Sequence, residues 1–290
     1  MIFYFMAGLP RAGSTVLSAL LNQNPRIHSG PSSPVVPTML DLEKSFSNNE
    51  LFLAYPKTEQ ARQIIASVLP QYYSDVQKPV VIDKNRSWVS RPEYITGYFN
   101  IEPKILCPVR NLDEIVASFV KMCHDNPIEA GKPINFIDKA LIQSNMELTD
   151  ENRASFVAGP GIIGQSFDGI RAILEAGQEK IIHFIEYDDL MSNPQETMNK
   201  IYEFLEEEPY EHDFDNIVNI HQEEDLTTYG IENMHKVGKK LKKSIIDPKE
   251  VLPESIYNLC QGQEFWRDLD TFEENDPVET PLEEAKIIGA

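Results

Sequence analysis

The first 22 residues constrain the fold of this chain more than any other stretch. An apolar run ends at Gly8, and Pro10 and Gly13 then mark a tight loop. Ser14 and Thr15 open a helical pattern with apolar residues on one face. This order predicts a strand, a loop and a helix. In such a corner the backbone N–H groups and the positive end of the helix dipole point at one place, where they favour an anion.

The glycines of this loop have the spacing of a phosphate-binding P-loop, but the cation lies elsewhere. A P-loop carries lysine directly after its second glycine, where this chain has Ser14, and Arg11 brings a cation into the loop instead. The segment resembles the 5′-phosphosulfate-binding loop of sulfotransferases that use 3′-phosphoadenosine 5′-phosphosulfate (PAPS), most of all tyrosylprotein sulfotransferases and related bacterial enzymes. The resemblance implies that the donor contacts five consecutive residues: Arg11, Ala12, Gly13, Ser14 and Thr15.

Two later predicted strands also end in a basic residue. A β-branched run ends at Lys84, and the run from Ile105 to Val109 ends at Arg110, before an amphipathic helix that contains Ser118. The carboxyl ends of parallel strands meet at one edge of a sheet, where ligands bind. By resemblance to the family, Lys84 contacts the bridging and sulfate oxygens of the donor, and Arg110 and Ser118 bind its 3′-phosphate.

Weaker parts of the resemblance lie further along the chain. Tyr187 begins the sequence Tyr-Asp-Asp-Leu, which is similar to the family's Tyr-Glu-x-Leu, where the tyrosine lies near the adenine. A late lysine-rich run contains Lys242 and Lys243. In the family a basic loop at this point closes over the 3′-phosphate and adenine, so the resemblance implies that both lysines bind the donor.

Strands alternate with helices from residue 2 to about residue 206. This alternation predicts an α/β, P-loop-like, three-layer fold with a mainly parallel central sheet flanked by helices. We expect one sulfotransferase-like domain over residues 1–267, in which residues 124–162 form an insertion that serves as acceptor pocket or lid. Residues 24–34, rich in proline and glycine, are expected to form a loop. The acidic residues 268–290 are expected to form a flexible tail.

Composition excludes several other classes of protein. The net charge of −20 argues against a nucleic-acid-binding surface. No apolar run has the length of a membrane span, and the first apolar run leads directly into the anion loop, as expected of a core strand. The chain has three cysteines, Cys107, Cys123 and Cys260. They have no metal-ligand spacing and form no disulfide framework, so we expect no metal and a cytoplasmic location.

The function implied by the resemblance is transfer of a sulfuryl group from PAPS to a hydroxyl or amine, with release of 3′-phosphoadenosine 5′-phosphate (PAP). The acceptor is a small molecule, a sugar or a peptide, and Lys84 and Arg11 are the expected catalytic residues. Two alternatives stay open. One is a P-loop-related small-molecule kinase that uses ATP, against which the missing P-loop lysine counts. The other is a non-catalytic module that binds PAP or another nucleotide.

The base that takes the acceptor's proton is not assigned by the sequence. In the family's cytosolic enzymes it is a histidine two residues after the strand-end lysine, where this chain has Arg86. In the tyrosylprotein enzymes it is a glutamate after the first helix, where residues 30–34 read Gly-Pro-Ser-Ser-Pro. Arginine cannot act as a base near neutral pH. Four candidates remain: His28, Glu43, Asp83 and His124.

Overall fold

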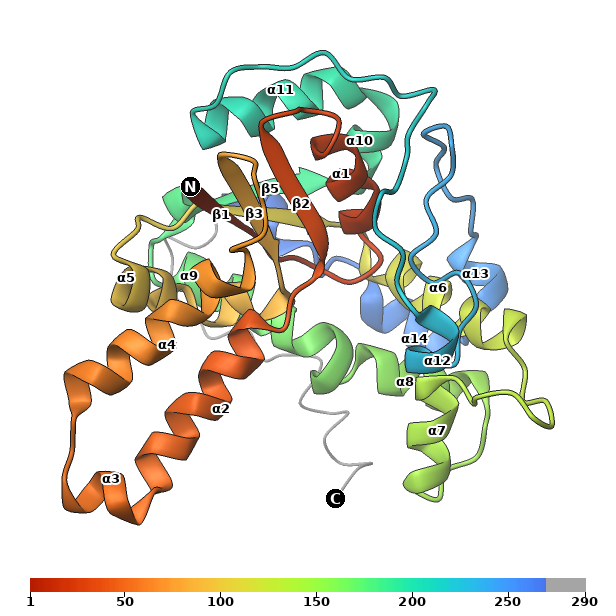
Figure 1. Ribbon diagram of the computed structural model, residues 1–290. Helices are drawn as coiled ribbons and strands as arrows, with labels where there is room; N and C mark the ends of the chain where they lie inside the picture. The colour runs from red at the N-terminus through yellow and green to blue at the C-terminus, as the bar shows by residue number, and fades with distance from the viewer. Residues whose placement is uncertain (270–290) are drawn as a thin grey trace.

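The computed structural model of the chain describes residues 1–269, and within them five strands form one sheet (Figure 1). The strand order is β2-β3-β1-β4-β5, and every neighbouring pair is parallel. The strands are β1 Ile2–Met6, β2 Ile27–Ser32, β3 Val80–Lys84, β4 Ile105–Val109 and β5 Ile182–Glu186. The parallel α/β fold predicted from the sequence is therefore confirmed.

One face of the sheet is covered by three helices, of which α11 lies at the top of Figure 1 and α1 lies beside β2. They are α1 Ser14–Leu21, α10 Tyr187–Ser192 and α11 Pro194–Leu205. Their buried apolar residues pack with Met6, Val80 and Ile82 of the strands. The neighbouring strand residues Phe5 and Val81 belong to the core on the other face. This alternation is the period-two pattern of a sheet that is buried on both sides.

The larger core lies on the opposite face of the sheet. Its helices come from many parts of the chain (Figure 1). They are α2 Val35–Asn48, α4 Thr58–Tyr72, α5 Pro92–Phe99, α6 Leu112–Asp125, α7 Phe136–Gln143, α8 Asp150–Ala158, α9 Gln165–Glu175, α13 Pro248–Val251 and α14 Glu254–Cys260. A short helix, α3 Glu50–Ala54, joins α2 to α4 at the end of a projecting helical pair.

The expected loop at residues 24–34 is a strand over part of its length, so that prediction is wrong. Strand β2 pairs with β3, with Ile27 opposite Val80, and the pairing is irregular between Ser29 and Ser32. Because β2 is the edge strand, Pro31 leaves no central ladder bond unmade. The proline and glycine content of this stretch is typical of a loop, and β2 is a strand because it pairs with β3.

After α11 the chain makes a long excursion, residues 206–244, which contains α12 Asp225–Tyr229. Its outgoing and returning parts run side by side, because the N–H of Ile217 donates to the Lys239 carbonyl oxygen at 2.7 Å and the N–H of Leu241 donates to the Phe214 oxygen at 2.9 Å. None of the helices described within residues 1–269 is long and apolar enough to cross a membrane. The predicted tail lies outside the described residues from residue 270 onward.

Candidate active site

A cavity of about 590 Å³ opens at the carboxyl edge of the sheet. Each of the three inner strands brings one predicted donor residue or segment to it. The loop after β1 forms its floor, Lys84 ends β3, and Arg110 follows β4. Ser118 of α6 and Tyr187, which follows β5, complete this side. The strand ends therefore meet as the sequence predicts for a parallel sheet.

The loop after β1 has the backbone of an anion-binding nest. Arg11 and Gly13 both adopt left-handed conformations, with φ of 59° and 88°. No side chain caps the first turn of α1, so the N–H groups after Gly13 stay free to meet a ligand. A Cβ atom at Gly8 would lie 2.2 Å from the Pro108 carbonyl oxygen, so only glycine allows β1 and β4 to meet this closely.

Two guanidinium groups, the buried Arg110 and the half-buried Arg11, form the cationic centre of the site. Arg11 donates from Nε to Ser118 Oγ at 3.2 Å and from Nη1 to the Met234 carbonyl oxygen at 2.8 Å. Arg110 donates from Nε to Glu114 Oε2 at 2.6 Å and lies over the Tyr187 ring, 4.2 Å from its centroid. Arg110 is 4% exposed, and its Nη2 is buried with no hydrogen-bond partner among the residues that the structure describes. A buried charged donor without a partner fits a site that binds an anion.

The electrostatics of these cations agree with that reading. Burial, and then the nearby Arg110, lower the pKa of Arg11. Burial also lowers the pKa of Lys84, against a smaller opposing effect of Glu223. The loss of hydration and the repulsion between like charges both destabilise these cations, and a bound phosphate or sulfate would offset both effects.

The remaining predicted donor residues lie in different surroundings. Gly13, Ser14, Thr15 and Lys242 line the cavity. Ala12 is buried and outside the lining, so the loop offers its backbone rather than its side chain.

Lys243 is not among the residues that line the cavity. Its Nζ forms an ion pair with Asp188 Oδ1 at 2.7 Å, and nearly half of the side chain is exposed. Lys236 and Lys240 of the same lysine-rich run do line the cavity, although the sequence did not single them out. In an irregular segment, spacing does not reveal which lysine faces inward.

Two of the four base candidates accept hydrogen bonds from aromatic side chains and lie outside the cavity lining. Asp83 is fully buried and accepts hydrogen bonds from Tyr73 Oη at 2.8 Å and Trp88 Nε1 at 2.6 Å. Burial raises the pKa of Asp83, although its hydrogen bonds oppose the shift. Glu43 accepts from the hydroxyls of Tyr94 and Tyr98, which join α2 to α5.

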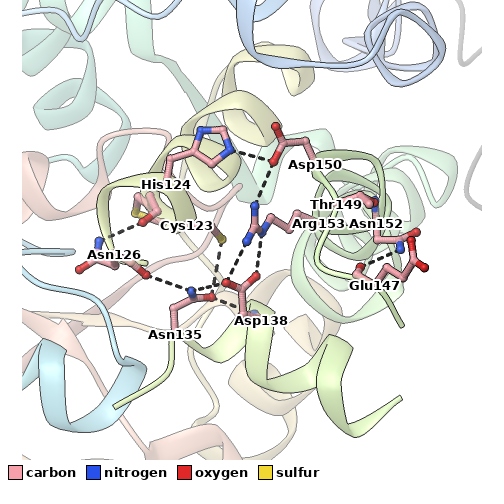
Figure 2. Close-up of polar contacts among 11 residues, drawn as sticks. Cys123, His124, Asn126, Asn135, Asp138, Glu147, Thr149, Asp150, Asn152 and Arg153 are labelled. Atoms are coloured by element: carbon pink, nitrogen blue, oxygen red, sulfur yellow. Dashed lines mark hydrogen bonds and ion pairs between the residues drawn. The ribbon is translucent and has the colours of Figure 1, made fainter. Parts of the chain in front are cut away.

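The two histidine candidates are also outside the cavity lining. His28 packs edge-on against Tyr73 and His221, with ring centroids 5.6 and 5.4 Å away, and burial lowers its pKa. His124 lies at the end of α6 in the network of Figure 2, where its Nε2 is 2.8 Å from Asp150 Oδ1. Arg153 links Asp150 to Asp138 in the same network.

The cavity also contains side chains that the sequence did not identify as functional. Arg86 lines it and donates from Nη1 to the Ile162 carbonyl oxygen at 2.6 Å. A row of rings forms one wall, with adjacent centroids 5.7 to 6.3 Å apart: Phe119, Phe136, Tyr229 and His235. No local motif announces this row, because its members come from α6, α7 and the 206–244 segment.

His235 is held by two carboxylates from its own segment. Its Nδ1 lies 2.8 Å from Glu223 Oε2 and 2.6 Å from Asp225 Oδ1. These three groups have candidate ligand atoms within 4.8 Å of one another, a spacing that a metal ion can also bridge. Burial lowers the pKa of His235, but the hydrogen bonds to Glu223 and Asp225 outweigh it and raise the pKa above its ordinary value.

The fold and the site thus define an α/β protein with a cavity, lined by Arg11, Lys84 and Arg110, at the carboxyl edge of a parallel sheet. A family model described as "Sulfotransferase domain" matches residues 4–247, and the chain belongs to this family. No curated protein sequence matches the chain.

Two solved structures are similar to the chain. Sulfotransferase STF9 from Mycobacterium avium superposes with a TM-score of 0.50 and 15% identity, covering 94% of this chain and 77% of that one. The sulfotransferase domain from the olefin synthase of Synechococcus PCC 7002 has a TM-score of 0.49 and 16% identity, covering 100% of this chain and 94% of that one. At such identities the likeness concerns the fold alone.

Proposed function

We propose that this sulfotransferase uses PAPS as donor and transfers its sulfuryl group to a hydroxyl or amine, releasing PAP. The observation that supports this most directly is Arg110. Its buried Nη2 has no partner among residues 1–269, and it lies beside Arg11 and Tyr187 in the cavity wall. A 3′-phosphate there would satisfy the free donor, and the hydroxyl of Ser118 lines the same cavity.

The other end of the donor is assigned to the loop and to the end of β3. The nest from Arg11 to Thr15 would hold the phosphosulfate through backbone N–H groups and the end of α1. Lys84, which is 6% exposed, would face the oxygen that joins phosphorus to sulfur. Negative charge grows on that oxygen as the S–O bond breaks, so a fixed ammonium stabilises the transition state.

The acceptor side is assigned to the aromatic wall and to residues 124–162. Phe136, Gly161 and Ile162 of that insertion line the cavity, together with Phe119 and Tyr229. These side chains offer apolar contact area, and a single polar end of the acceptor would meet the sulfur. We therefore propose an acceptor with an apolar body and a hydroxyl or amine at its tip. One domain over residues 1–267 and a cytoplasmic location remain predictions.

The test of this function compares nucleotides by thermal unfolding. PAP at about 100 times its Kd should stabilise the protein by about 2.7 kcal/mol and raise its Tm by several degrees. ATP, which lacks the 3′-phosphate, should shift the Tm far less. Equal shifts from ATP and PAP would contradict the proposal and favour a kinase.

A second arm of the test separates catalysis from binding. Wild-type protein is incubated with sulfur-labelled PAPS and a panel of phenols, alcohols, amines, sugars and peptides. Labelled product is the expected result. Binding of PAP without transfer to any acceptor would support a non-catalytic module instead.

A further inference from the structure

His235 is the one histidine among residues 1–269 that lines the cavity, and its orientation is determined by its neighbours. Glu223 and Asp225 both meet its Nδ1, and the second oxygen of Asp225 accepts the backbone N–H of His235 at 2.8 Å. A nitrogen that faces two carboxylates carries the proton of the neutral ring. The other nitrogen, Nε2, has no hydrogen-bond partner within residues 1–269 and is therefore the free base.

The position of His235 is tied directly to the donor loop. The carbonyl oxygen of Met234, the preceding residue, accepts a hydrogen bond from Arg11 Nη1 at 2.8 Å. Asp225 interacts electrostatically with Arg11, and Glu223 does so with Lys84. The two carboxylates that hold His235 are therefore close enough to Arg11 and Lys84 to oppose the lowering of the pKa of each cation by burial.

The insertion at residues 124–162 supports the segment that carries His235. The N–H of Glu232 donates to Asn126 Oδ1 at 2.8 Å. Gly230 has a φ of 67°, and a Cβ atom there would lie 2.2 Å from the Ile134 carbonyl oxygen, so only glycine fits. Asn126 belongs to the network of Figure 2, in which it is joined to Asn135. The position of His235 is thus set by contacts between two distant parts of the chain.

From this geometry we propose that His235 is the catalytic base that removes the acceptor's proton, with Glu223 and Asp225 as positioning residues. The proposal rests on the proposed sulfuryl transfer. The acceptor oxygen or nitrogen forms a bond to sulfur while the bond from sulfur to the phosphate oxygen breaks. That electron pair leaves with PAP, and the acceptor's proton moves to Nε2 of His235. The resulting imidazolium is stabilised by the two carboxylates.

The groups that face His235 set the direction of its pH dependence. Glu223 and Asp225 meet its Nδ1, and the Tyr229 ring lies 5.7 Å from its own. The cations Arg11 and Lys84 act on these carboxylates from the donor side. Because the carboxylates raise the pKa of His235, the rate should rise with pH through a midpoint above the ordinary histidine value of about 6.5.

The first experiment replaces the histidine. His235→Gln should lower kcat by about 10²- to 10⁴-fold, the range for a lost general base, while the Tm shift caused by PAP stays as in wild type. The matched control is His183→Gln, since His183 stacks on Phe204 outside the cavity lining and should keep the wild-type rate. If wild type transfers sulfate and His235→Gln keeps its rate, the inference alone fails. If wild type binds no PAP, the proposed function fails and the inference fails with it.

The second experiment tests the positioning residues. Glu223→Gln and Asp225→Asn each remove a carboxylate that raises the pKa of His235, so each should move the acid limb of kcat/KM to lower pH. Nitrogen NMR of ¹⁵N-histidine-labelled protein gives a readout independent of turnover, with His235→Gln assigning the signal. The neutral ring should be protonated at Nδ1, and its pKa should fall in both variants. An acid limb and a pKa that stay unchanged in both variants would overturn the proposal.

Two further outcomes would also overturn it. Loss of activity in His221→Gln without loss in His235→Gln would transfer the role to His221, whose buried Nε2 has no hydrogen-bond partner within the described part of the chain. Inactivation by EDTA with recovery on adding Zn²⁺ would make the Glu223, Asp225 and His235 cluster a metal site. The expected result is full activity in EDTA.

Discussion

The two walls of the cavity are built by different physical means. The donor wall, the side of the cavity that we propose binds the donor, consists of residues at the carboxyl ends of three neighbouring parallel strands, so the pairing of the sheet places the loop, Lys84 and Arg110 together. The acceptor wall, the side that we propose meets the acceptor, is held by individual hydrogen bonds between segments far apart in the chain. Arg11 bonds to the Met234 oxygen, and the N–H of Ser244 donates to Tyr187 Oη at 2.9 Å.

This difference shows where each property of the protein is encoded. The end of a strand can be predicted from a local sequence pattern, and the parallel pairing of the sheet then places the strand ends side by side. The 206–244 segment has little regular structure, and its course depends on partners such as Gln23, which bonds to the backbone of Asp213. Substitutions in the donor wall should therefore act on the donor and the transfer step, and substitutions in the 206–244 segment on the acceptor chemistry and local stability.

Among the residues at the carboxyl ends of the strands, the largest effect is expected at Lys84. Lys84→Ala should lower kcat by about 10²- to 10³-fold, the scale of one lost donor that stabilises transition-state charge. Affinity for PAP should change much less, because the contact strengthens as the S–O bond breaks. Steady-state rates with saturating donor and calorimetric titration with PAP separate the two. Lys84→Arg should restore part of the rate, since a planar guanidinium does not reproduce a compact ammonium. Weak binding of PAP with normal turnover at saturation would contradict this role.

The next effect is expected at Arg110. Arg110→Ala should weaken PAP binding by about 2 kcal/mol, or roughly 30-fold, the scale of a hydrogen bond to a charged group. Adenosine 5′-phosphosulfate lacks the 3′-phosphate and should bind almost as it does to wild type. Titration of both ligands against both proteins measures the difference. An equal loss of affinity for the two ligands would show that Arg110 is a structural residue and does not contact the 3′-phosphate.

The smallest effect concerns the stability of the 206–244 segment at acidic pH. His212 stacks on Tyr202 and its Nε2 lies 3.0 Å from the Tyr202 hydroxyl, and burial lowers its pKa to about 4. The unfolded chain, with an ordinary pKa near 6.5, binds more protons between these values. The free energy of unfolding should therefore fall by about 1 kcal/mol as pH decreases from about 6.5 to about 4, after allowing for solvent screening.

His212→Gln removes this titration, so its unfolding free energy should depend less on pH over the same window. Denaturant unfolding at several pH values measures the change, and amide hydrogen exchange should show it first in residues 206–244. A constant difference between His212→Gln and wild type at every pH would show that His212 does not couple the segment to pH.

The proposed base, His235, was not among the candidates predicted from the sequence. His235 lies in a lysine-rich run, where its role has no local sign, and its partners Glu223 and Asp225 are ten or more residues earlier. The four candidates taken from the sequence were chosen because their side chains can accept a proton. The residue type does not show whether a side chain faces the cavity. Asp83 and Lys84 are neighbours on β3, yet Asp83 is enclosed by Tyr73 and Trp88 while Lys84 lines the cavity.

Strand-end patterns, by themselves, determined the parallel α/β fold, because it follows from short-range periodicity. The family followed from the resemblance of the first loop and of the strand-end residues to sulfotransferase motifs. The tertiary structure alone decided which polar side chains enter the cavity. It made β2 a strand through pairing with β3, enclosed Asp83 and Glu43 in hydrogen bonds, and brought His235 to Arg11 across the fold. Those outcomes depend on contacts between residues distant in sequence, and such contacts form only when the whole core packs.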